Sequence, residues 1–153
     1  MARVYLLANP SPLINLLYTV DKAVGVAGSP NVRDDVALVQ FLLRAVMEDG
    51  KDYRIPPGPP LSIDGTCGPQ TILYIRSWQQ QESKLAAGFA VPMQDGVISP
   101  MTNRSGLGSL SHLRYSIVSL NMRYSQANGI QKLANIATDP RCPTDLLPSI
   151  FWR

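Results

Sequence analysis

The sequence is poor in the residues that most often build reactive or metal-binding sites. Its 153 residues include one histidine, His112, and two cysteines, Cys67 and Cys142. Neither cysteine belongs to a Cys-x-x-Cys or Cys/His cluster, so we expect no metal site, and no nucleophile elbow accompanies the histidine. The cysteines could pair in an oxidising compartment, or each could be a small buried apolar residue, and the sequence leaves both interpretations open.

Charged residues and long apolar runs are also scarce. Charged residues make up 16% of the chain, the formal net charge is +3, and the basic residues are scattered without a run. We therefore expect no nucleic-acid partner. No segment reaches the ~18 uninterrupted apolar residues that span a membrane. The apolar segment 4–8 is interrupted by Asn9-Pro10-Ser11-Pro12 and has no small-x-small cleavage site, so we expect synthesis in the cytoplasm without a signal peptide.

What the chain does contain is helical periodicity separated by proline-rich and glycine-rich connections. The first clear helix follows Asn31, a candidate N-cap, and ends near Asp49-Gly50. Its apolar positions recur at helical spacing, at Val36, Val39, Leu43 and Val46. After it, two proline pairs at 56–60 predict a stiff loop over residues 51–62, because proline excludes helix and central strand.

Four further helical segments are expected. One starts at Pro69, one runs from Ser109 to Asn128-Gly129, and one runs from Ile130 to Ala137. A short helix is also expected near the N-terminus, on the spacing of Leu13, Leu16, Leu17 and Val20. The apolar tail 146–153 should pack back on the domain or bind a partner. Since no strand pattern of any length is present, we predict a mainly α fold.

The segment 63–79 has the most specific pattern. Asp64 can bond its own downstream amides and Gly65 permits positive φ, so the chain should turn sharply there. Pro69 suits the first turn of a helix, whose one face carries Thr71, Tyr74, Ile75 and Trp78. Gln79 could bond a loop backbone. A second Asp-Gly turn at Asp95 hints at a weak internal repeat.

This pattern resembles the peptidoglycan-binding-like domain family, whose signature is an apolar-Asp-Gly-x-apolar-Gly-Pro-x-Thr turn followed by a helix that ends in aromatic-Gln. The matching residues are Ile63, Asp64, Gly65, Gly68, Pro69, Thr71, Tyr74, Ile75, Trp78 and Gln79. Residues 31–43 look like the family's first helix, and residues 95–100 are similar to its later Asp-Gly turn. The resemblance covers roughly residues 24–120 and implies a three-helix core.

The chain departs from the family at several points. Cys67 stands where a larger apolar residue is usual, Tyr74 replaces what is often alanine, and the proline-rich loop 51–60 looks like an insertion. We therefore divide the chain into an N-terminal arm over 1–23, a peptidoglycan-binding-like domain over 24–127 and a C-terminal helical extension over 128–153.

The resemblance implies a non-catalytic module that binds peptidoglycan, through its glycan or its stem peptide. Aromatic platforms and a few donors would be needed, and the candidates are Tyr53, Arg54, Tyr74 and Arg76, whereas Trp78 is expected in the core. The only glutamates, Glu48 and Glu82, flank helices, and the paired acids Asp34-Asp35 and Glu48-Asp49 lie at helix ends that explain them. A muramidase would need two carboxylates across a cleft, so we expect neither catalysis nor a cofactor.

An alternative function is structural. The apolar arms at both ends exceed what the module needs and would suit a protein partner, as in an adaptor of a phage tail, a contractile injection device or a type VI secretion assembly. Such a machine is assembled from the cytoplasm, whereas a wall-binding module would act in the periplasm or cell wall. An accessory domain of a wall hydrolase is a third, weaker alternative.

Overall fold

The computed structural model describes residues 2–7, 14–86, 92–101 and 115–150. The main elements in chain order are β1 (Arg3–Leu6), β2 (Leu16–Thr19), β3 (Val24–Gly25), α1 (Arg33–Asp49), α2 (Pro69–Leu85), β4 (Val97–Ile98), α3 (Ser116–Asn128), α4 (Ile130–Ala134) and α5 (Leu147–Ile150). Two short 3-10 helices, η1 (Ile136–Thr138) and η2 (Thr144–Leu146), precede α5. The predicted mainly α class is confirmed.

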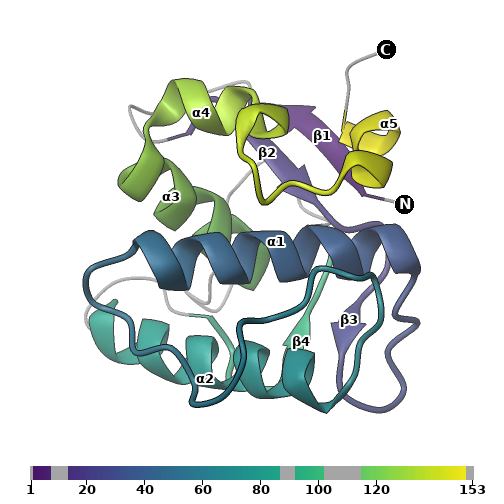
Figure 1. Ribbon diagram of the computed structural model, residues 1–153, viewed down its shortest axis with the longest axis vertical. Coiled ribbons are helices and arrows are strands. Elements are labelled where there is room, and N and C mark those ends of the chain that lie inside the picture. Colours follow the sequence, from purple (N-terminus) through teal and green to yellow (C-terminus); the bar gives the residue numbers. More distant parts are fainter. Residues whose placement is uncertain (1, 8–13, 87–91, 102–114, 151–153) are drawn as a thin grey trace.

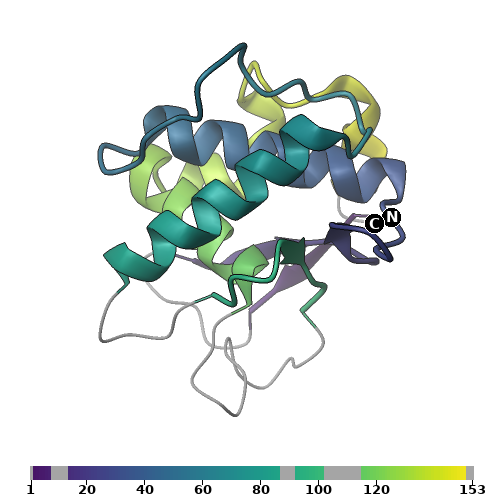
Figure 2. The same ribbon diagram turned by 90° about the horizontal axis from the view of Figure 1, so that it is seen from below.

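Helix α1 runs through the middle of the molecule. In Figure 1 it lies between α2 on one side and α3 with α4 on the other, and Figure 2 shows α2 crossing it. Nearly every side chain from Asp35 to Met47 is buried as a result. Helix α1 is therefore buried on most of its circumference rather than along one stripe. The other described helices and strands pack around it.

The two arms share this core with the central helices. Ala2, Leu17, Leu146 and Ile150 are all buried, within the same apolar cluster as α1. The expectation that the C-terminal tail packs back on the domain is confirmed for residues 146–150, while residues 151–153 lie outside the described part. Among the described helices, none is long and apolar enough to cross a membrane.

The expected N-terminal helix is wrong over the described residues 14–20, which contain strand β2. β2 pairs antiparallel with β1, with Val4 opposite Tyr18. All four residues of β2 are buried, so apolar side chains occupy both faces of the strand. A short apolar run of this kind has no alternation and looks the same in a buried strand as in a buried helix. Its partner strand, β1, was not predicted either.

Two helix starts also differ from expectation. Asn31 is not the N-cap of α1; that residue is Val32, and the Asn31 side chain instead bonds both the N–H and the C=O of Gly25. Helix α3 begins at Ser116, after Tyr115, which is non-helical with ψ 131, and the start expected at Ser109 lies outside the described residues. His112 lies outside the described residues. The fourth helix ends at Ala134 and is followed by η1.

A buried glutamine anchors each Asp-Gly turn to a helix. The Oε1 atom of Gln40, on α1, accepts the N–H groups of Asp64 and Gly65 at 3.0 and 2.9 Å. Its Nε2 donates to Asp64 Oδ1 at 3.1 Å and to the Thr71 hydroxyl at 2.9 Å. Such a set of bonds satisfies a buried amide completely and fixes the turn against α1.

The second turn repeats the arrangement. The Oε1 atom of Gln79, on α2, accepts the N–H of Gly96 at 2.9 Å, and its Nε2 donates to the carbonyl of Val97 at 3.0 Å. Nε2 also donates to the Ser116 hydroxyl, which joins the turn to the start of α3. Gln79 thus bonds a loop backbone, and the weak repeat seen in the sequence corresponds to two turns built alike.

Candidate binding pocket

The residues of the family-like motif form the scaffold rather than a pocket. Gly68 is the N-cap of α2 and Pro69 is its first residue. Thr71 and Gln79 are 2% and 0% exposed and are occupied by the bonds of the two turns, and Trp78 is fully buried. These side chains are committed to the turns and the core, so none of them is available to a ligand.

The structure does not bring the four candidate ligand residues together. Tyr53 and Arg54 lie against the C-terminal half of α2, where the Arg54 backbone bonds the Gln81 side chain. Tyr74 is 3% exposed and packs into the core. Arg76 lies along the second turn, where a methyl group added at Gly96 would come within 3.0 Å of its Nε. Tyr53 lines a pocket of about 340 Å³ within the described part of the chain, whereas Tyr74 borders a much smaller one of about 90 Å³.

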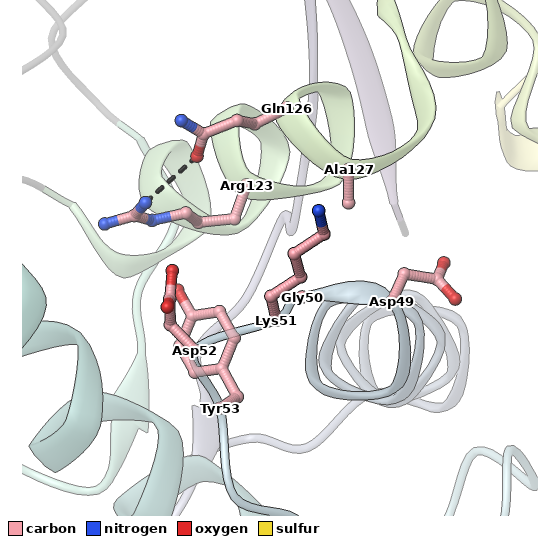
Figure 3. A pocket seen from close by; sticks show the side chains of 8 residues that line it. All are labelled: Asp49, Gly50, Lys51, Asp52, Tyr53, Arg123, Gln126 and Ala127. Atoms are coloured by element: carbon pink, nitrogen blue, oxygen red, sulfur yellow. Dashed lines mark hydrogen bonds between the residues drawn. The ribbon is translucent and has the colours of Figure 1, made fainter.

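That pocket lies between the loop that follows α1 and the last turns of α3 (Figure 3). Its volume is about 340 Å³, and it is lined by Asp49, Gly50, Lys51, Asp52, Tyr53, Arg123, Gln126 and Ala127. The Lys51 side chain reaches from the loop toward α3, whereas the Asp49 carboxylate points away from the other groups. We refer to this hollow as the 49–53/α3 pocket.

A buried carboxylate organises one wall of the 49–53/α3 pocket. Glu82, on α2, is 2% exposed, and both of its oxygens accept from Arg123 Nε at 3.1 Å. The Tyr53 hydroxyl donates to the same carboxylate. Burial and the neighbouring Glu82 raise the pKa of Tyr53 well above its usual value. The three side chains therefore hold one another in a fixed arrangement, as a charged group taken out of water requires.

Asp49 is held by a second cluster behind the pocket. Arg141 Nη2 donates to Asp49 at 2.6 Å and to Asp139 at 2.8 Å, and Asn128 also donates to Asp49. Burial alone would raise the pKa of Asp49, but the hydrogen bonds from Arg141 and Asn128 outweigh it, and the pKa lies below its ordinary value. Asp49 thus anchors the end of α1, and its carboxylate oxygens are already occupied by Arg141 and Asn128.

The groups that remain for a ligand are of both signs. Lys51 and Asp52 are exposed and have no ion pair or hydrogen bond in the described part of the chain. Arg123 uses Nε for Glu82 and Nη1 for Gln126, which leaves Nη2 open toward solvent among the described contacts. An ammonium, a carboxylate and a guanidinium edge beside a tyrosine can bind a small group that carries a carboxylate and an amine together.

The Glu82 carboxylate and the two thiol groups are each accounted for by the fold. Both oxygens of Glu82 accept from the Arg123 guanidinium, and the carboxylate also accepts from the Tyr53 hydroxyl, so these partners already occupy it. Within the described residues, no cluster of three His, Cys, Asp or Glu side chains could hold a metal ion. Cys67 and Cys142 are both free thiols and half-buried, and burial raises the pKa of Cys142 to about 11.

Comparisons of the chain with protein-family models, with curated proteins and with solved structures each find no match. Glu82 and Arg123 were not among the residues that sequence reasoning selected. One signal was present, since Glu82 falls four residues after Trp78 and so on the same buried face of α2.

Proposed function

We propose that the protein is a non-catalytic module that binds cell-wall peptidoglycan, with the 49–53/α3 pocket as its ligand site. The strongest support is a set of charged side chains of both signs around one tyrosine. Lys51, Asp52 and the outer edge of Arg123 have no hydrogen-bonding partner among the described residues. Peptidoglycan stem peptides present free carboxylates and amines close together. The turn pattern at 64–71, with its resemblance to peptidoglycan-binding-like domains, supports the same class of ligand.

The pocket chemistry favours the stem peptide over the glycan within that class. A carboxylate of the peptide would lie against Lys51 and the outer edge of Arg123, and an amine would face Asp52. The Tyr53 ring adds an apolar surface that is rigid, because its hydroxyl is tied to Glu82. A glycan would need several flat aromatic surfaces, and Tyr53 is the one aromatic residue that lines this pocket among the described residues.

The test is co-sedimentation with purified murein sacculi at low salt. The double variant Lys51→Ala/Asp52→Ala removes one charge of each sign, so the net charge of the protein is unchanged. A matched control is Lys22→Ala/Asp145→Ala, which removes an exposed lysine and an exposed aspartate elsewhere. We expect wild type and control to pellet and the pocket variant to stay in solution. Wild-type protein that does not pellet contradicts the proposal.

A second candidate function is an adaptor in a phage tail, a contractile injection device or a type VI secretion assembly. It is favoured by the position of the two arms, since β1 and α5 lie side by side in Figure 1 and are in contact. Truncation of the arms is a poor test, because Ala2, Leu17 and Ile150 are buried in the core. A cleaner one compares the proteins captured from native lysate by wild type and by Leu6→Lys, and identical sets contradict an adaptor role for this surface.

A further inference from the structure

Among the described residues, one edge of strand β1 has no hydrogen-bonding partner, whereas both edges of β2 are occupied. On one side β2 pairs with β1. On the other side the Asn121 side chain, from α3, accepts the Tyr18 N–H at 2.9 Å and donates to the Tyr18 carbonyl at 2.8 Å. A side-chain amide thus takes the place of a neighbouring strand. No such group bonds the outer edge of β1 in the part of the chain that the structure describes.

The register identifies which groups of β1 are free. The Leu7 N–H bonds the Asn15 carbonyl, so the hydrogen-bonded positions of this antiparallel pair are Leu7, Tyr5 and Arg3. Between them, the N–H and C=O groups of Val4 and Leu6 turn away from β2. The side chain of Leu6 is 62% exposed, among the most exposed of the described large apolar residues. An open edge with an exposed leucine is a surface on which another strand can pair.

We propose that this edge pairs with β1 of a second copy of the chain, antiparallel, about a two-fold axis at Tyr5. In that register Val4 lies opposite the second copy's Leu6, and Leu6 opposite its Val4. Both are positions with outward-facing N–H and C=O groups, so each pair exchanges two hydrogen bonds. The edge is therefore complementary to itself, which an isologous interface requires.

The side chains support a second copy as the occupant. Val4 and Leu6 project to the same face of the sheet as Tyr18, next to an apolar hollow of about 280 Å³ that Val4, Tyr18 and Ile150 help to line. The second copy's Leu6 would cover Val4 at the rim of this hollow. Arg3 brings no repulsion, because Asp21 neutralises it at 2.6 Å. The proposal is independent of peptidoglycan binding.

The first experiment measures the oligomeric state by light scattering during size-exclusion chromatography over a range of concentrations. Leu6→Lys places a charge next to the axis, opposite the second copy's Val4, and Leu73→Lys makes the same change at an exposed leucine of α2. We expect dimers for wild type and for Leu73→Lys, and loss of the dimer for Leu6→Lys. A wild type that stays monomeric at every concentration, or equal effects of both variants, overturns the proposal.

The second experiment tests the register by cysteine cross-linking, in a background with Cys67→Ser and Cys142→Ser. Residues that face each other at the axis lie at a Cα separation of about 4.5 Å, which a disulfide can span. Tyr5→Cys is therefore expected to form a covalent dimer on mild oxidation. Arg3→Cys lies off the axis, and its two copies are too far apart to react. Equal cross-linking of both variants, or none with Tyr5→Cys, contradicts this register.

Discussion

The two Asp-Gly turns are built alike and attached differently. Each is held by a buried glutamine of the preceding helix, and each glycine has positive φ, 76° at Gly65 and 72° at Gly96. Gln40 accepts two backbone N–H groups and ties the first turn to the junction of α1 and α2. Gln79 accepts one and reaches on to Ser116 of α3. The shared pattern is thus a way to attach a turn to a helix, and it says little about a ligand.

The second turn also depends on a close approach that the first lacks. Gly25 in β3 has a φ of 145° and lies against the backbone of the second turn. A methyl group there would overlap the carbonyl oxygen of Gly96 and lie 2.9 Å from Val97 Cα. The first turn is approached instead by Arg33 at the start of α1, whose Cγ and carbonyl oxygen would lie 2.6 and 3.1 Å from a methyl group at Gly65. The second turn should therefore be the more sensitive to a change on its partner strand.

The largest expected effect follows from that contact. Gly25→Ala combines an unfavourable φ with a backbone clash and should lower the free energy of unfolding by about 3–4 kcal/mol. The measurement is urea denaturation, with amide hydrogen exchange to locate the damage. We expect Gly96 and Val97 to lose protection and Gly65 to keep it. Uniform loss at both turns would mean that they are not separate units.

Replacing the glutamines tests the anchors themselves. Gln40→Leu leaves the N–H groups of Asp64 and Gly65 without their acceptor. We expect the free energy of unfolding to fall by about 3 kcal/mol. Gln79→Leu leaves one backbone N–H, that of Gly96, without its acceptor and should lower the free energy of unfolding by about 2 kcal/mol. Denaturation midpoints of the two variants, compared side by side, measure the difference. A larger loss of stability for Gln79→Leu than for Gln40→Leu would contradict this order. It would mean that the bond from Gln79 to Ser116 stabilises the fold more than the second backbone N–H that Gln40 accepts.

The turn glycines should respond less strongly and nearly equally. Gly65→Ala and Gly96→Ala each place a side chain in the left-handed region. Each should lower the free energy of unfolding by about 1–2 kcal/mol. The added methyl would meet Arg33 Cγ at 2.6 Å in the first turn and Val26 Cγ1 at 2.9 Å in the second. Thermal unfolding of the two variants gives the comparison. A Gly96→Ala protein as stable as wild type would show that the second turn can change its conformation.

The smallest effect is a pH dependence of the first turn. The pKa of Asp64 lies below its ordinary value of 3.8, because its carboxylate accepts the Thr66 N–H and a bond from Gln40. A lowered pKa means that Asp64 stabilises the fold above its unfolded-state pKa, and that this contribution disappears as the pH falls through the folded-state pKa. Asp64→Asn should therefore weaken stability near neutral pH and make little difference in strong acid. A pH-independent difference in denaturation midpoint contradicts this origin.

Local patterns predicted the parts of the fold that depend on neighbours in sequence. The start of α2 at Pro69 and the end of α3 before Gly129 follow from single residues with strong preferences. The strand β2 was missed because its apolar residues are buried on both faces and its partner lies elsewhere in the chain. Asn31 has the side chain of an N-cap, but Gly25 competes for it, and only the folded chain shows which bond forms.

The pocket was the hardest part to predict. Glu82 and Arg123 lie on different helices, and nothing in the sequence near either indicates that they meet. Gln40 could have been recognised, since it falls within the apolar stripe of α1 and a buried amide there needs partners. Of the four candidate ligand residues, Tyr53 is the one that lines the 49–53/α3 pocket.

We propose that the ligand binds in the 49–53/α3 pocket and that the Asp-Gly turns are structural. NMR titration of the labelled protein with a soluble muropeptide tests it most directly. We expect concentration-dependent shifts of the amides at 49–53 and 123–127, with Gly65 and Gly96 unchanged. Shifts centred on the two turns, or no shifts with any muropeptide, would contradict it.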